Sequence, residues 1–239
     1  MICETHVDHA AASASACAIV SNALRARPSL VLGLPTGHTP VALYAGLVAA
    51  RLDWSAVRTF NLDEFIGLPA QHRASFRAFM DEHLFSRVNL PASHIGFLQG
   101  DTDDDVAECE RYERAITAAG GIDLLVLGLG ANGHIGFNEP GPALVASTHA
   151  TALHPSSRAA NADRFGGEAA RVPPRALTIG MGHVLRARAV VMIATGASKT
   201  DAVAAMVKGP LTTSCPASWL QVHPAVTLVL DDASATRLG

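Results

Sequence analysis

The sequence predicts an α/β fold: a modified Rossmann-like, doubly wound, mainly parallel sheet with helices on both faces. Its strand-like segments are apolar throughout instead of alternating, which is typical of strands buried on both faces. Helix-like segments separate most of them, as parallel β–α units require. The 239 residues are 49% hydrophobic and 16% charged, enough apolar material for a thick core. No repeat or linker interrupts the pattern, so we expect a single domain over residues 1–239.

The first quarter of the chain predicts two strand–helix pairs. Residues 7–27 are rich in alanine and favour a helix. Residues 29–34 predict a short buried strand, which Pro35 ends. Residues 40–51 favour a helix with proline in its first turn. A further strand is expected at residues 57–62.

The middle of the chain continues the alternation. Residues 75–87 predict an amphipathic helix opened by a serine cap. A strand is expected at residues 94–98. Residues 103–119 favour a helix, with acids in the first turn and arginines later, as the helix dipole prefers. Residues 122–127 predict a buried strand.

The last part of the chain begins with a long segment, up to about Arg175, that we expect to be irregular. Strands are then predicted at residues 176–180 and 189–195, a helix at 198–208 and a last strand at 225–230.

Composition excludes several classes of protein. The net charge is −3 and no basic run stands out, which argues against a nucleic-acid partner. The four cysteines form no C-x-x-C pair, so neither a zinc site nor a disulfide framework is expected. No apolar run approaches the ~20 residues that span a bilayer, and no signal peptide is indicated. We therefore expect a cytoplasmic protein without a membrane partner, and an anionic small substrate remains compatible.

Four chemically distinctive segments follow predicted strands. Ligands of an open parallel sheet bind beyond the carboxyl ends of its strands, so we expect these segments to line one crevice. They are residues 35–40, 61–65, 128–140 and 195–199.

The segment GLGANGHIGFNEPGP, residues 128–142, places His134 five residues before Glu139 on a loop rich in glycine and proline. An imidazole and a carboxylate on one rigid loop are suited to proton transfer, and Asn132 could join them in a hydrogen-bonded relay. A core histidine is the alternative. The loop formally matches G-x-G-x-x-G, but no helix pattern follows and no acid lies ~20 residues on, which argues against a dinucleotide site.

The segment NLDEF places two acids directly after a buried strand. One of them, for which Asp63 is our choice, could act as a general base whose pKa burial raises. The alternative is a carboxylate that caps a helix or a turn.

Two strand–helix turns suit a phosphate group. Free backbone N–H groups at the turn formed by Thr36, Gly37, His38 and Thr39 would face an anion, although an ordinary turn with a threonine cap is the alternative. Lys199 lies near a helix start, where a cation is unfavourable unless an anion accompanies it. A solvated surface lysine is the alternative there.

Taken together, LGLPTGHTP (32–40), FNLDEF (60–65), GLGANGHIGFNEPG (128–141) and TGASK (195–199) resemble the glucosamine-6-phosphate deaminase family. The similarity runs over nearly the whole chain. It implies the modified doubly wound fold and the conversion of a 2-amino-2-deoxyhexose 6-phosphate plus water into fructose 6-phosphate and ammonia. The partner is then a small amino-sugar phosphate, and no metal or organic cofactor is implied.

The resemblance also implies roles for single residues. His134, oriented by Glu139 and Asn132, would open the pyranose ring. Asp63 would move a proton between C2 and C1.

The phosphate, by the same resemblance, would be held by the Thr36–Thr39 backbone, by Lys199 and by an arginine. Arg164 is our choice for that arginine, with Arg158 as the alternative.

Three features depart from the family pattern. Longer members have aspartate where this chain has Asn132, and the family often has glycine where this chain has His38, which could contact the phosphate or only occupy the turn. Residues 142–153 lack lysine and arginine, so we expect no allosteric activation by an acetylated amino-sugar phosphate.

Several alternatives remain at this stage. A galactosamine-6-phosphate deaminase differs only in the configuration at C4 of its substrate. A 6-phosphogluconolactonase-like hydrolase has a similar G-H loop. A non-catalytic sugar-phosphate sensor would use the same crevice. A nicotinamide dehydrogenase is the least favoured alternative. The sequence leaves the oligomeric state open, a homo-oligomer included.

Overall fold

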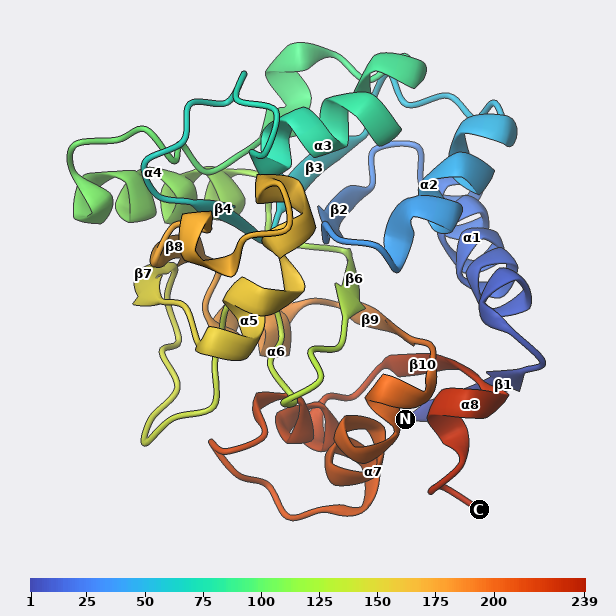
Figure 1. Cartoon of the computed structure of the whole chain (residues 1–239). Coiled ribbons are helices and arrows are strands. Elements are labelled where there is room, and N and C mark those ends of the chain that lie inside the picture. Colours follow the sequence, from blue (N-terminus) through green and yellow to red (C-terminus); the bar gives the residue numbers. More distant parts are fainter.

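A computed structural model describes residues 1–239 and contains two sheets (Figure 1). The strands of the large sheet are β1 (Ile2–His6), β2 (Val31–Leu34), β3 (Arg58–Asn61), β5 (Ile95–Gly96), β6 (Leu124–Gly128), β9 (Ala189–Ala194) and β10 (Val226–Asp231). Their order is β1-β10-β9-β6-β2-β3-β5, and every neighbouring pair is parallel. The small sheet consists of β4 (Asp63–Phe65), β7 (His149–Ala152) and β8 (Arg175–Thr178). It is antiparallel, in the order β4-β8-β7. The mainly parallel α/β fold that the sequence predicts is confirmed.

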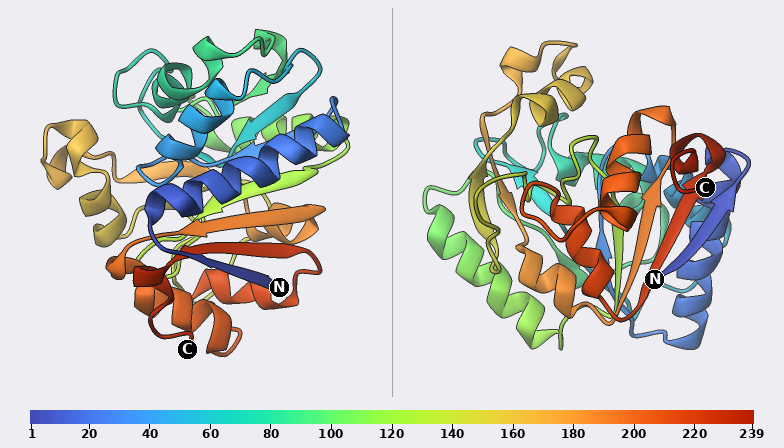
Figure 2. Two further views of the ribbon diagram at one scale, coloured as in Figure 1. Left: turned by 90° about the vertical axis from the view of Figure 1, so that its right-hand side faces the viewer. Right: turned by 90° about the horizontal axis from the view of Figure 1, so that it is seen from below.

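Helices cover both faces of the large sheet (Figure 2). The helices are α1 (His9–Ala26), α2 (Pro40–Ala49), α3 (Phe76–His83), α4 (Asp105–Ala118), α5 (Pro155–Ala160), α6 (Met181–Arg186), α7 (Thr200–Lys208) and α8 (Asp232–Ala235). Within β6, Leu124 and Val126 pack in the core under α1 and α2, whereas Leu125 and Leu127 pack in the core under α4, α6 and α7. Successive strand residues point to opposite faces, so a strand covered on both sides must be apolar at every position.

The predicted helix caps form as the sequence indicates. Ser75 accepts a hydrogen bond from the N–H of Ala78 at the start of α3, and Asp104 accepts from the first turn of α4. The helix expected at residues 7–27 begins at His9, because the Asp8 side chain accepts from the N–H of Ala11 and caps it there. No helix is both long and apolar enough to cross a bilayer.

The structure corrects three expectations. Residues 176–180, expected as a strand among the parallel ones, contribute β8 to the antiparallel sheet, where β8 pairs with β4 and β7. The segment up to Arg175 is not irregular throughout, because it contains β7 and α5. The strand expected at residues 94–98 shortens to two residues at the edge of the large sheet. The edge strand β1 was not predicted, since its five residues include Glu4 and His6 and are largely exposed.

The direction of winding reverses between the neighbouring strands β2 and β6. From β2 the chain proceeds to β3 and β5 on one side, and from β6 to β9 and β10 on the other. The loops that follow β2 and β6 therefore separate at a topological switch point, where α/β proteins bind ligands.

Candidate active site

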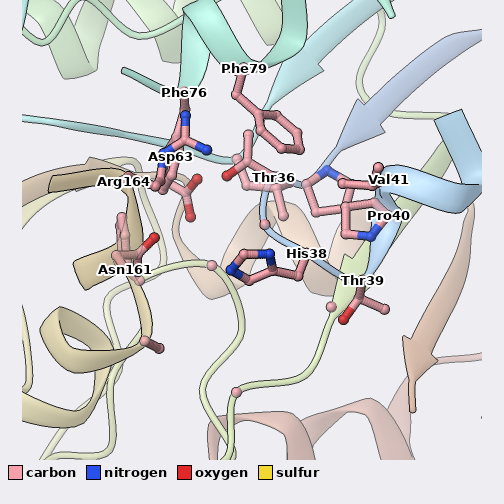
Figure 3. Close-up of a pocket in the computed structure, with 18 of the residues that line it drawn as sticks. Thr36, His38, Thr39, Pro40, Val41, Asp63, Phe76, Phe79, Asn161 and Arg164 are labelled. Atoms are coloured by element: carbon pink, nitrogen blue, oxygen red, sulfur yellow. The ribbon is translucent and has the colours of Figure 1, made fainter. Parts of the chain in front are cut away.

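A cleft of about 620 Å³ lies at the carboxyl ends of these strands. All four segments expected to share a crevice contribute to it, together with α3 and the segment that contains α5. Figure 3 shows the turn after β2 on one side and Asp63, Arg164 and Asn161 on the other, with the His38 ring between them. The predicted convergence of distant loops is confirmed.

The two adjacent acids of the NLDEF segment have different environments. Asp63 lines the cleft, is 6% exposed, and its carboxylate receives no hydrogen bond from the protein. Glu64 is 1% exposed and points the other way, accepting from the N–H groups of Phe65, Phe76 and Arg77. Both interpretations of the segment therefore hold, one for each residue: Glu64 is the capping carboxylate, and Asp63 is the acid that faces the cleft.

Burial changes the proton affinity of Asp63. Removal from water, with a smaller contribution from neighbouring Glu64, raises its pKa to about 8. Water would solvate the ionised form, and no protein donor replaces it. Asp63 therefore gains or loses a proton close to neutral pH, as a general base should.

The His134 imidazole is held by hydrogen bonds at one nitrogen. Nδ1 lies 2.6 Å from Oδ1 of Asn132, and Asn132 Nδ2 donates to Glu139 at 3.1 Å. The amide oxygen can only accept, so Nδ1 carries the proton and Nε2 is the free nitrogen. Ser157 Oγ lies 3.4 Å from the same Nδ1. The relay expected among Asn132, His134 and Glu139 is present in the structure.

Glu139 lies behind His134 and does not line the cleft. Burial alone would raise its pKa, but hydrogen bonds and the charge of His134, with hydrogen bonds from Ser157 and Asn132, lower it to about 2. The carboxylate therefore stays ionised and faces Nδ1 of His134 across 3.4 Å.

Glycine and asparagine give the histidine loop its shape. A Cβ on Gly130 would lie 2.3 Å from the His134 ring, so only glycine leaves room for the imidazole. Gly136 has a φ of 55° and passes close to Oδ2 of Asp63. Asn138 is buried and donates to the carbonyls of Ile135 and Ile179. These contacts fix the loop against the carboxyl end of β8, just before α6.

The turn after β2 presents an unblocked helix start to the cleft. Thr36, Gly37, His38 and Thr39 all line it, and Gly37 has a φ of 106°. Thr39 makes no side-chain cap, so the alternative of an ordinary threonine cap is wrong. The N–H groups of Gly37, His38 and Thr39 donate to no protein acceptor. The buried Tyr44 hydroxyl donates to the Pro35 carbonyl and holds the turn from beneath.

Lys199 reaches the cleft from the turn after β9. It occupies the N-cap position of α7, and its ammonium has neither an ion-pair nor a hydrogen-bond partner. Burial lowers its pKa. The turn itself is fixed by buried Asp231, which accepts two hydrogen bonds from the N–H of Gly196. An unpaired, half-buried cation at a helix start is suited to an anion.

Arg164, not Arg158, faces the cleft. Its guanidinium donates to the carbonyls of Ala74 and Ser75 and lies over the Phe76 and Phe79 rings at 5.5 and 5.0 Å. Nη1 has no protein partner and is free for a ligand. Arg158 instead donates to the carbonyls that precede β8 and does not line the cleft.

Several residues that line the cleft are not predicted from the sequence. Arg73 precedes α3, His83 is its last residue, and Asn161 precedes Arg164. Nothing in their spacing distinguishes them from surface residues. No three His, Cys, Asp or Glu side chains gather in a geometry that could hold a metal ion.

Fold and cleft together define an α/β protein in which Asp63 and His134 share a cleft with a turn whose backbone N–H groups are free. The chain belongs to the family of glucosamine-6-phosphate isomerases and 6-phosphogluconolactonases, whose model matches residues 6–229.

Among its relatives, glucosamine-6-phosphate deaminase 2 of Bacillus subtilis is 44% identical, covering 92% of this chain and 91% of its own. The glucosamine-6-phosphate deaminase of Shewanella loihica is also 44% identical, covering 92% and 84%. The structure of a monomeric glucosamine-6-phosphate deaminase superposes with a TM-score of 0.95 at 34% identity over 99% of both chains. The 6-phosphogluconolactonase of Trypanosoma brucei, at 20% identity and a TM-score of 0.76, shares the fold.

Proposed function

We propose that this protein is an enzyme that converts glucosamine 6-phosphate and water into fructose 6-phosphate and ammonia. The observation that carries the proposal is that Asp63 and His134 line one cleft with the unpaired cations Arg164 and Lys199. Relatives at 44% identity bear the name of that deaminase. An aldose–ketose isomerisation needs a base and a ring-opening group, and a sugar phosphate needs a cationic anchor.

His134 is the residue proposed to open the sugar ring. Its Nε2, free while Nδ1 is bound to Asn132, would accept the proton of the anomeric hydroxyl and return it to the ring oxygen as the C1–O5 bond breaks. The imidazolium formed in between is stabilised by the ionised carboxylate of Glu139 behind it. Asn132 fixes the tautomer.

Asp63 is the residue proposed to catalyse the isomerisation. Its carboxylate would remove the proton from C2 of the open aldehyde while the 2-ammonium group gives a proton to the C1 oxygen, which forms an enolamine. Protonated Asp63 would then return the proton to C1, which leaves a hydroxyl at C1 and an iminium at C2. A pKa near 8 makes the carboxylate a stronger base than an exposed aspartate. Water then adds to the C2 iminium and ammonia leaves, so the overall change consumes one water per sugar.

The phosphate is proposed to bind at the opposite end of the substrate. The proposed donors are the free N–H groups of the turn at residues 37–39, Nη1 of Arg164 and the Lys199 ammonium, and all of these residues line the cleft. His38 extends from the same turn and is proposed to contact the phosphate as well.

A direct test measures ammonia release from glucosamine 6-phosphate and from galactosamine 6-phosphate by the same coupled assay. The proposal expects the gluco sugar to have the higher kcat/KM. Ammonia released faster from the galacto sugar would reassign the substrate. Hydrolysis of 6-phosphogluconolactone without deamination of either amino sugar would overturn the proposal.

We also infer that residues 1–239 fold as one domain that works in the cytoplasm. One hydrophobic cluster contains residues from α1 and from β10, so the two ends of the chain share a core. Sugar phosphates are charged and do not leave the cell by diffusion. Limited proteolysis that releases no stable fragment, together with cell fractionation, tests both points.

A further inference from the structure

Glu64 is a buried carboxylate that the proposed mechanism does not use, although it is next to the proposed base. It is fully enclosed, and a Cβ on Gly100 would lie 3.1 Å from its side chain. Oε1 accepts from the N–H groups of Phe65 and Phe76, at 2.8 and 3.0 Å, and Oε2 accepts from that of Arg77 at 2.9 Å. Burial raises the pKa of Glu64 to about 7, while these three N–H donors and the charge of Arg164 act in the opposite direction, so the carboxylate is ionised above neutral pH.

The turn that Glu64 holds is the one on which Arg164 rests. Arg164 donates to the carbonyls of Ala74 and Ser75, directly before the N–H groups that Glu64 accepts. Its guanidinium also lies over Phe76 and Phe79, both of which line the cleft. If the first turn of α3 shifted, the arginine proposed to bind phosphate would shift with it.

The charge of Glu64 also acts on Asp63. The two carboxylates belong to consecutive residues of β4, both are buried, and Asp63 accepts no hydrogen bond from the protein. Above neutral pH, where Glu64 is ionised, its negative charge disfavours loss of the proton from the unsolvated carboxyl group of Asp63.

We propose that Glu64 is a positioning residue with two separable effects: its charge strengthens Asp63 as a base, and its hydrogen bonds place Arg164 through the first turn of α3. This inference rests on the proposed function.

Other titratable groups near Asp63 do not replace Glu64. Tyr44 and Tyr112 are buried, and their pKa values are raised well above 10, first by burial, so they stay neutral at working pH. His134 and Arg164 line the same cleft and are present in every variant compared.

Two substitutions separate the effects. Glu64→Gln removes the charge but keeps an oxygen for Phe65 and Phe76. Glu64→Asp keeps the charge but is one methylene too short to reach the turn. The first readout is the acid limb of the kcat/KM–pH profile, which reports the base of the free enzyme. The second is the dissociation constant of inorganic phosphate from calorimetry, which requires no turnover.

Glu64→Gln should move the acid limb to lower pH by about one unit and leave phosphate affinity within about twofold. Glu64→Asp should leave the limb in place and weaken phosphate binding about fivefold, the size of a lost helix cap. Glu110→Gln, an exposed change on α4, should alter neither. If Glu64→Asp does not fold, Ser75→Ala replaces it, because Ser75 caps the same turn through Ala78.

An acid limb that does not move in Glu64→Gln overturns the effect on Asp63. Unchanged phosphate affinity in Glu64→Asp, or in its replacement, overturns the effect on Arg164. If wild-type enzyme releases no ammonia, the proposed function fails instead, and the phosphate titrations still decide whether Glu64 places Arg164.

Discussion

Nδ1 of His134 lies 2.6 Å from Oδ1 of Asn132, so the neutral amide decides which ring nitrogen carries the proton. An aspartate at this position would stabilise the imidazolium by charge as well as fix the tautomer. Here Glu139, ionised and 3.4 Å from Nδ1, supplies the charge instead. Orientation and charge stabilisation are thus divided between two residues.

Asn132→Ala should lower kcat about 10- to 100-fold with little change in KM, since the imidazole loses the partner that fixes its tautomer. Steady-state kinetics on glucosamine 6-phosphate measure this. Asn22→Ala, an exposed amide on α1, should behave as wild type. An increase in KM with an unchanged kcat would show that Asn132 binds substrate and does not orient His134.

Gly130→Ala should displace the His134 ring, because the new methyl group would lie 2.3 Å from it. We expect kcat to fall at least about 10-fold while the free energy of unfolding changes by about 1 kcal/mol. Gly141→Ala is the matched control on the same loop, with no atom nearer than 3.8 Å to its Cβ. Equal kcat in the two variants would be inconsistent with a closely packed ring.

Asp63→Asn should abolish isomerisation, a loss of about 10²- to 10⁴-fold in kcat or more, because the amide cannot accept the C2 proton. Binding of inorganic phosphate, measured by calorimetry, should stay close to wild type. Turnover at the wild-type rate in this variant would remove Asp63 from the role of base.

The same substitution should stabilise the protein above neutral pH. In the folded state burial, with Glu64, raises the Asp63 pKa to about 8, whereas an unfolded chain has about 4. Ionisation therefore favours unfolding, and the stability that protonated Asp63 contributes at low pH is lost as pH rises towards 8.

Asn cannot ionise, so Asp63→Asn should gain stability relative to wild type between about pH 4 and 8 and reach a plateau above. The gain should be about 2 kcal/mol or more. Urea unfolding at pH 5 and pH 8.5 checks it. A difference that does not depend on pH would show that Asp63 is ionised in the folded protein.

Lys199→Ala should raise KM about 10-fold or more and alter kcat less, because the phosphate is remote from the bonds that change. The same kinetics with Lys208→Ala, an exposed lysine at the other end of α7, serve as the control. An unchanged KM would show that the unpaired ammonium does not contact the phosphate.

Apolar strand segments and the turns after them were enough to predict the parallel sheet, the shared cleft and Asp63, His134 and Lys199. These signals are local: a buried strand is apolar at every position, and a helix start exposes N–H groups whatever packs around it. The glycine-rich loop around His134 was predicted from the local sequence as well.

Other features depend on contacts between residues far apart in the chain. The sequence could not separate Asp63 from Glu64, because two of the three donors to Glu64 belong to α3 and reach it only in the folded chain. It could not decide between Arg164 and Arg158, since both lie in one segment and only their docking partners differ. Nor did it show that residues 176–180 join β4 instead of the parallel sheet. Backbone hydrogen bonding and burial across the chain decided these points, because the free energy of each contact depends on a partner that local sequence does not contain.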